Sequence, residues 1–152
     1  MIKDKAQSLN LDNITGGRAV VSGHILSDRA DIFAANERGA NYLYKNNNGN
    51  FEDVAFDYRV DDAIQNGRGT ALSDIYYRGR LDILSGNWLG YHRAWVLEKN
   101  EFKDIGNKDF DKPSRIRTII SADFDNDGFD EVFMNNIACL LYTSDAADDG
   151  YR

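Results

Sequence analysis

The 152-residue chain lacks several features that mark common classes of protein. Its one cysteine, Cys139, defines no disulfide framework and gives no information on the redox compartment. No apolar run approaches the roughly 18 residues of a membrane span, which argues against membrane insertion. No apolar stretch follows the first five residues, as a signal peptide would require. In a complete chain, that absence would indicate the cytoplasm.

Basic residues are outnumbered. The chain has 18 Lys and Arg against 25 Asp and Glu, with a formal net charge of −7. Phosphate binding needs clustered Lys and Arg, so nucleic acid and anionic membranes are poor candidates for the main partner. Cations and basic surfaces fit better.

Sequence patterns for catalysis are also missing. The chain has two histidines, and we find no Ser-His-Asp arrangement and no H-E-x-x-H spacing. We therefore expect no enzymatic activity from these residues.

The sequence does contain a repeat with a period of about fifty residues. Gly17-Arg18 recurs as Gly67-Arg68, and a third copy opens at Arg117. Each copy continues with an apolar run and then with an acidic residue before a second apolar run. The matched runs are 19–21, 70–72 and 117–120; 31–33, 82–84 and 131–133; 42–46 and 93–97; and 51–54 and 102–105.

Four short strands per repeat predict an all-β fold, a partial β-propeller with four-stranded blades of about fifty residues. We expect the last strand of one blade at Ile2-Lys3-Asp4, then two full blades and half of another, together residues 1–138. A β-sandwich with coincidental spacing is the alternative. An open circle leaves sheet faces uncovered, so we expect the fragment to fold poorly by itself.

One loop of the third repeat has the spacing of a metal site. Asp123, Asp125, Asp127 and Glu131 stand at positions one, three, five and nine of a D-x-D-x-D-G-x-x-E loop, and Phe129 offers its backbone carbonyl. Hard oxygen ligands that converge on one point suit calcium, whereas magnesium prefers to retain its waters. Apolar residues on both sides place the loop in a β-hairpin.

A metal-free turn, with Asp side chains bonded only to backbone amides, is the alternative. Charge argues against that alternative. With Asp130, which we expect to point to solvent, five acids fall within nine residues, and no basic residue lies between Arg117 and Arg152. Without a cation, their repulsion would open the loop.

The equivalent loop of the second repeat runs from Asp74 to Asp82. Tyr76 and Arg78 replace its inner carboxylates. We expect the guanidinium of Arg78 or Arg80 to neutralise the two remaining acids, so that this loop binds no metal.

Several longer sequence words resemble a known family. They are 36–41, 67–72, 86–93 and 121–127. With the Asp-rich loop, they resemble the FG-GAP/VCBS-repeat propellers of the cartilage acidic protein 1 family, over residues from about 1 to 138. The resemblance implies a secreted, calcium-binding scaffold for recognition or adhesion, with extracellular matrix or cell-surface proteins or glycans as partners. A propeller domain of a larger secreted or cell-surface enzyme is the alternative.

Two weaker signals concern the surface. Asn13-Ile14-Thr15 fits an N-glycosylation acceptor in an expected loop. His92, close to Trp88, is the best remaining candidate for a binding surface. The alternative is that Trp88 and Trp95 pack between blades and that His92 lies in a loop.

Residues 139–152 are predicted to form no part of the fold. From Cys139 to Asp149 they resemble a transposase-type sequencing adapter translated in one frame, and the repeat pattern stops just before them. An independent clone of the same locus is expected to lack them. Native genomic reads through the same codons would contradict this prediction.

Overall fold

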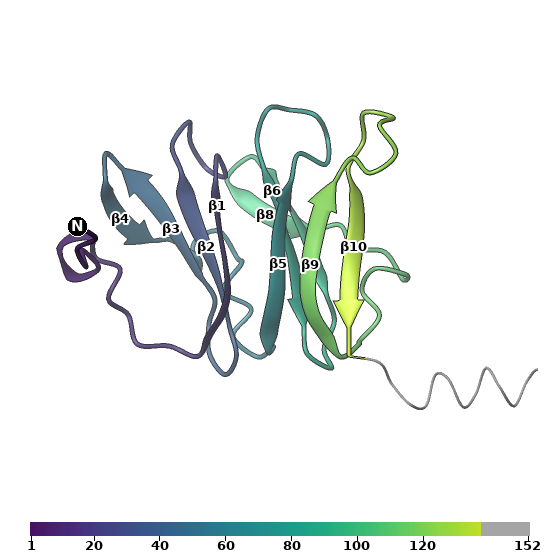
Figure 1. Ribbon diagram of the computed structural model, residues 1–152, viewed down its shortest axis with the longest axis horizontal. Coiled ribbons are helices and arrows are strands. Elements are labelled where there is room, and N and C mark those ends of the chain that lie inside the picture. The colour runs from purple at the N-terminus through teal and green to yellow at the C-terminus, as the bar shows by residue number, and fades with distance from the viewer. Residues whose placement is uncertain (138–152) are drawn as a thin grey trace, which may run out of the picture.

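The computed structural model describes residues 1–137 as three antiparallel β-sheets (Figure 1). The strand orders are β1-β2-β3-β4, β5-β6-β7-β8 and β9-β10. A single 3-10 turn, η1 (Gln7–Leu9), precedes them. The bounds are β1 Gly17–Gly23, β2 Asp31–Asn36, β3 Tyr42–Asn47, β4 Asn50–Asp53, β5 Gly67–Ser73, β6 Asp82–Asn87, β7 Arg93–Glu98, β8 Glu101–Asp104, β9 Ile116–Ala122 and β10 Glu131–Asn136.

The sheets confirm the all-β class, with two four-stranded blades followed by half of a third. In each sheet the acidic residue that the repeat analysis singled out begins the second strand. Asp31 pairs with Gly23, Asp82 with Ser73 and Glu131 with Ala122. The loop between the first two strands therefore opens at the same place in every blade.

The strand expected at Ile2-Lys3-Asp4 does not form, and this part of the prediction is wrong. Residues 1–5 have no strand pairing, and Ile2 is fully exposed. An outermost strand needs a neighbour that offers backbone hydrogen bonds, and no described strand of a preceding blade provides them.

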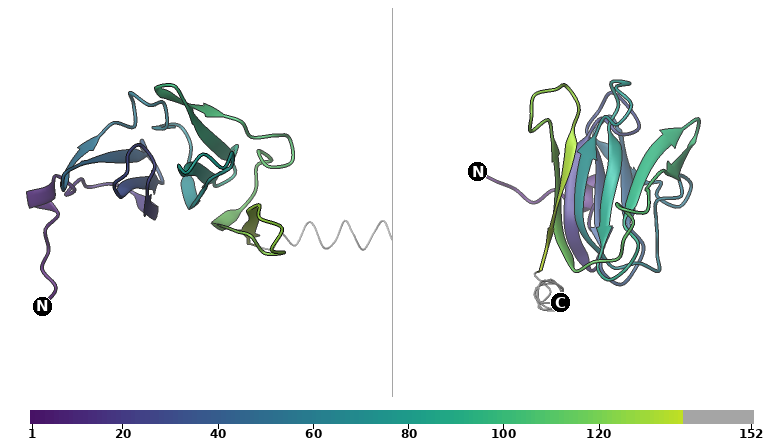
Figure 2. Two further views of the ribbon diagram at one scale, coloured as in Figure 1. Left: turned by 90° about the horizontal axis from the view of Figure 1, so that it is seen from above. Right: turned by 90° about the vertical axis from the view of Figure 1, so that its right-hand side faces the viewer.

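The first strand of each sheet lies beside the first strand of the next. β1 contacts β5, β5 contacts β9, and the sheets follow one another in succession (Figures 1 and 2). The approach of β5 to β9 requires a glycine, because a Cβ on Gly69 would lie 2.7 Å from the Cα of Thr118. The loops that join the first and second strands all stand at the upper end in Figure 1.

Apolar side chains fill the space between the first two blades. Phe33 of β2 and Trp95 of β7 are both buried and meet edge to face, with ring centroids 5.9 Å apart. The cluster contains Ile25, Phe33, Ala35, Leu43, Val54, Ala55, Val60, Ile83, Trp95, Leu97 and Phe102.

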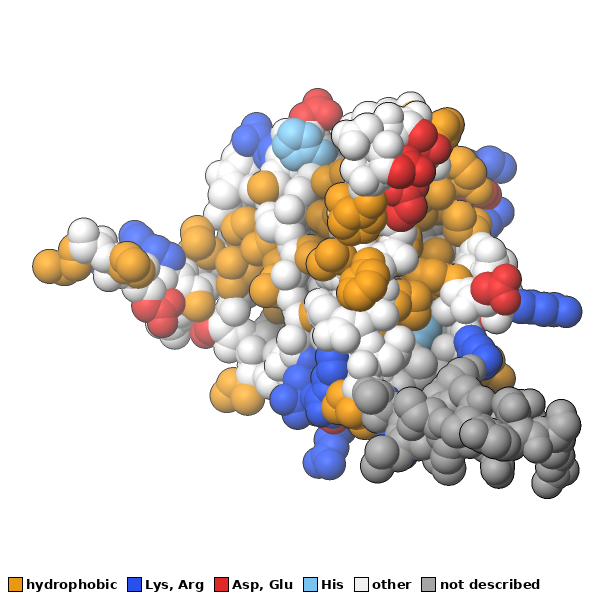
Figure 3. Space-filling model, turned by 45° about the vertical axis from the view of Figure 1, so that its right-hand side comes forward, with side chains coloured by type: hydrophobic (Ala, Val, Ile, Leu, Met, Phe, Trp, Pro, Cys, Tyr) orange, Lys and Arg blue, Asp and Glu red, His pale blue; other side chains and the backbone are white. Residues whose placement is uncertain are grey.

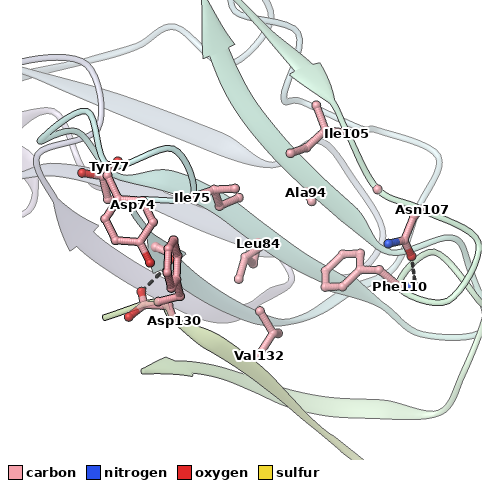
Figure 4. A pocket seen from close by; sticks show the side chains of 13 residues that line it. Asp74, Ile75, Tyr77, Leu84, Ala94, Ile105, Asn107, Phe110, Asp130 and Val132 are labelled. Carbon is pink, nitrogen blue, oxygen red and sulfur yellow. Dashed lines mark hydrogen bonds between the residues drawn. The ribbon is translucent and has the colours of Figure 1, made fainter. Parts of the chain in front are cut away.

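Between the second blade and the half blade, the packing leaves a cavity of about 260 Å³ beside Leu84, Ala94 and Val132 (Figure 4). The equivalent space one blade earlier is filled from β7 and β8, by side chains that include Trp95 and Phe102. Their counterparts in the third repeat would come after residue 137, outside the described residues.

Replacing Phe33 with Ala is expected to lower the free energy of unfolding by about 3–5 kcal/mol, since the change leaves a cavity in the core between blades. The measurement is urea unfolding followed by circular dichroism.

The matched control is Phe56→Ala, because Phe56 is 80% exposed whereas Phe33 is 0% exposed. The control should change the free energy of unfolding by less than about 0.5 kcal/mol. Equal effects of the two substitutions would contradict the packing described here.

Candidate metal site

The loop between β9 and β10 brings three predicted ligands together. Asp123, Asp125 and Glu131 each offer a carboxylate oxygen, and these oxygens lie within 4.8 Å of one another at the surface. Oxygen-only ligands with this spacing can surround a calcium ion while water completes its coordination. Among the described residues, this is the group of acidic side chains that fits a metal ion.

Backbone hydrogen bonds hold the loop in shape. The Asp123 carboxylate accepts the N–H groups of Asp127 at 3.1 Å and Gly128 at 3.0 Å, and the Glu131 carboxylate accepts the N–H of Phe124 at 2.8 Å. Gly128 has a φ of +93°, a conformation that strains residues with a Cβ. A carboxylate has about four acceptor positions, so these bonds leave capacity for a cation.

Asp127 is not a member of the group of three carboxylates. Its carboxylate accepts the N–H of Phe129 at 2.8 Å. The Asp side chains thus make the turn-type hydrogen bonds of the metal-free alternative, and they also bring three carboxylates close together. The roles of Asp127 and of the Phe129 carbonyl as ligands stay predictions.

The loop of the second blade is built on the same backbone hydrogen bonds. The Asp74 carboxylate accepts the N–H groups of Arg78 at 2.8 Å and Gly79 at 2.6 Å, as Asp123 accepts those of Asp127 and Gly128. Asp82, which corresponds to Glu131, accepts the N–H of Ile75 at 3.2 Å. The two loops therefore differ in side chains rather than in framework.

A guanidinium neutralises the second loop. Arg78 donates to the Asp82 carboxylate at 2.8 Å and to the carbonyl of Leu97 at 3.0 Å. Of the two arginines that the sequence left open, Arg78 pairs with Asp82, whereas Asp74 accepts backbone N–H groups and has no ion pair among the described residues. Burial raises the pKa of Asp82, and the neighbouring Arg78 acts in the opposite direction.

Asp130 is exposed, as expected, but its side chain also makes contacts within the protein. Its carboxylate accepts the hydroxyl of Ser73 at 2.7 Å, in the second blade, and the hydroxyl of Ser121 at 3.3 Å. Beside it, Tyr77 and Phe129 meet edge to face at 4.9 Å, and burial followed by the nearby carboxylates raises the pKa of Tyr77. The candidate metal loop is thus attached to the preceding blade (Figure 4).

His92 is fully buried, which corrects its assignment to a binding surface. Its Nδ1 accepts the N–H of Asn87 at 3.0 Å, and its Nε2 lies 2.9 Å from the hydroxyl of Ser114. Burial lowers the pKa of the imidazole. The sequence contained no signal for these partners, because Ser114 lies 22 residues away.

Trp88 is partly exposed and lies between two arginines. The guanidinium carbons of Arg68 and Arg117 are 5.1 Å and 4.9 Å from its ring centroid. The packing of Trp95 between blades and the position of His92 in the loop between β6 and β7 confirm two parts of the alternative weighed above. Asn13 is exposed in the loop before β1, where its side-chain amide donates to the Tyr44 hydroxyl at 2.9 Å. Its glycosylation stays a prediction.

Comparison with known proteins defines the class of this chain. Residues 74–134 match the model of the FG-GAP-like repeat. This range includes both the second-blade loop and the candidate metal loop. Among the described residues, no helix has the length and apolar character to cross a membrane.

The chain is homologous to a segment of cartilage acidic protein 1. It is 46% identical to the Xenopus tropicalis protein over 144 residues, which cover 91% of this chain. It is 45% identical to the mouse and human proteins in alignments of 157 residues, gaps included, which cover 99% of this chain. The chain spans 22–24% of the length of these relatives.

Replacing Arg78 with Met is expected to destabilise the second blade by about 2 kcal/mol at pH 7, because the buried Asp82 loses its cation. The pKa of Asp82 in the folded state should rise further above its usual 3.8. The folded state then binds more protons than the unfolded state, so stability should fall as the pH rises through that window.

The measurement is denaturant unfolding at pH 4 and pH 7. The control, Arg80→Met, removes an exposed charge from the same loop and should have a small effect at both pH values. A loss of stability in the Arg78 variant that does not depend on pH would contradict the role of the Arg78–Asp82 ion pair.

Proposed function

We propose that this chain is part of a non-catalytic extracellular recognition scaffold whose third blade is stabilised by calcium. One observation carries the proposal. Two loops share the same framework of backbone hydrogen bonds, and one of them contains its own cation, Arg78. In the other loop an aspartate, Asp127, stands at that position, and three carboxylates gather beside it.

Electrostatics explains why the replacement of Arg78 by Asp127 at the equivalent position favours a metal ion. In the second blade, a guanidinium balances Asp82. In the third, Asp123, Asp125 and Glu131 have no basic side chain in the loop to balance them. Carboxylates at such short separations repel one another, and a divalent cation bound by their oxygens removes the repulsion.

The exposure of the site supports an extracellular setting. Calcium sites of extracellular modules bind with Kd values of roughly 10⁻⁴–10⁻³ M, weaker than those of cytosolic buffers. Three grouped carboxylates at the surface fit that weaker class. The name of the relatives, cartilage acidic protein 1, also favours an extracellular matrix protein.

Recognition rather than catalysis is supported by how the structure uses its polar residues. The imidazole of His92 is buried, with both ring nitrogens beside hydrogen-bond partners. The loops, by contrast, project from a framework of packed sheets, an arrangement that suits the binding of matrix or cell-surface proteins or glycans.

Replacing Asp125 with Asn is expected to weaken calcium binding at least about tenfold, because it removes a charged ligand. Asp127→Arg should abolish binding while the loop stays ordered, since the new guanidinium would act as Arg78 does. Calcium at a hundred times Kd should stabilise the unsubstituted chain by about 2.7 kcal/mol. Calorimetric titration and thermal unfolding provide the two measurements.

Asp28→Asn is the matched control, because Asp28 is exposed in the corresponding loop of the first blade. It should leave the calcium isotherm unchanged. The proposal fails if the Asp125 variant and the control give the same isotherm as the unsubstituted chain.

A further inference from the structure

Each innermost strand carries an arginine at the same position. Arg18, Arg68 and Arg117 are the second residues of β1, β5 and β9. In all three strands the pairing register shifts at this residue, for example between Gly67, which pairs with Asn87, and Gly69, which pairs with Gly86. Each arginine is thus the extra residue of a β-bulge, a device that redirects a side chain and is frequent beside functional sites.

The residue between neighbouring arginines comes from the segment that follows the second strand of each blade. After β2 this residue is Glu37, and its carboxylate forms ion pairs with both Arg18 and Arg68. After β6 it is Trp88, whose ring lies between Arg68 and Arg117. The same position therefore holds a carboxylate in one blade and an aromatic ring in the next.

The exchange of Glu37 for Trp88 changes what the arginines can still bind. A carboxylate neutralises a guanidinium and accepts its N–H groups, whereas an aromatic ring attracts the cation through its face and accepts no conventional hydrogen bond. Arg117 is exposed and has no recorded ion pair within residues 1–137. The buried Nε of Arg68 also donates to no group in the described part of the chain.

Within residues 1–137, the position on the other side of Arg117 is not acidic either. Ile137, which follows β10, corresponds to Glu37 and Trp88 and is apolar. Arg115, just before β9, adds another exposed guanidinium. Although the whole chain is acidic, Lys and Arg side chains gather at the lower edge in Figure 3, at the end opposite the Asp-rich loop.

We propose that Arg117, which lies against Trp88 and close in sequence to the exposed Arg115, binds the sulfate or carboxylate groups of an acidic polysaccharide. The planar guanidinium forms paired hydrogen bonds with such oxyanions. Two guanidiniums already lie over the Trp88 ring, so the ring is less available for stacking with a nucleic-acid base, and this argues against single-stranded nucleic acid. Because the arginine recurs in successive blades, a linear polymer with repeated charges can contact more than one.

This inference rests on the proposed recognition function and names the class of partner. The probe is heparin, a sulfated polysaccharide, titrated calorimetrically into the full 152-residue chain at low salt. Arg117→Gln should weaken binding at least about tenfold. Trp88→Glu should do the same, because the new carboxylate would occupy both arginines as Glu37 does. Glu37→Gln should strengthen binding, because it releases Arg18 and Arg68.

The matched control is Arg80→Gln, which removes one exposed arginine at the upper end of the second blade. It should leave heparin affinity within about twofold. Equal weakening by Arg117→Gln and Arg80→Gln would show non-specific attraction and overturn the proposal. Absence of heparin binding, or inorganic sulfate binding as tightly as heparin, would also overturn it.

Two cross-tests separate this proposal from the calcium site. Arg117→Gln should leave the calcium isotherm unchanged, and Asp125→Asn should leave heparin binding unchanged. Calcium binding without heparin binding would refute the polysaccharide site alone. Far-UV circular dichroism verifies that each variant is folded. If Trp88→Glu does not fold, the test rests on the heparin affinity of Arg117→Gln, because Arg117 is exposed.

Discussion

Every blade has to stabilise an acidic side chain at the start of its second strand. In the first blade, Asp31 accepts backbone N–H groups from Leu26 at 2.7 Å and Asn46 at 2.8 Å. In the second blade, Asp82 is completely buried and pairs with the guanidinium of Arg78. Glu131 of the third accepts one N–H and joins two further carboxylates, and there a calcium ion is proposed to do the work of Arg78.

The acid matters because it fixes the loop between the innermost strand and its neighbour. In the third blade this loop also reaches the second blade, through the bond from Ser73 to Asp130 and the contact between Tyr77 and Phe129. The proposed calcium ion would therefore order more than a hairpin. It would also fix side chains that connect two sheets beside the cavity between them.

The strands could be predicted from the sequence because each blade repeats the same apolar runs between acidic and Asn/Gly turn residues. The failed strand at Ile2 repeats the pattern of Phe51 and Phe102, but a strand requires a partner as well as a pattern. Likewise, the spacing of the Asp-rich loop predicted the grouped carboxylates. It contained no information on Ser73, 57 residues away, whose hydroxyl donates to the Asp130 carboxylate.

The arginines show a second limit, which concerns the prediction of binding partners from composition. A net charge of −7 argues against polyanions when it is averaged over the chain, but the fold sorts charges by position along each strand. Acids stand at the upper end of the second strands, and arginines stand at the lower end of the innermost ones. At each end, equivalent strand positions of successive blades carry side chains of the same charge. A neighbouring side chain determines whether the protein itself supplies the opposite charge. Arg78 and Glu37 supply it, whereas Asp127 and Trp88 do not, and this difference is the basis for the proposed cation site at one end and the proposed anion site at the other.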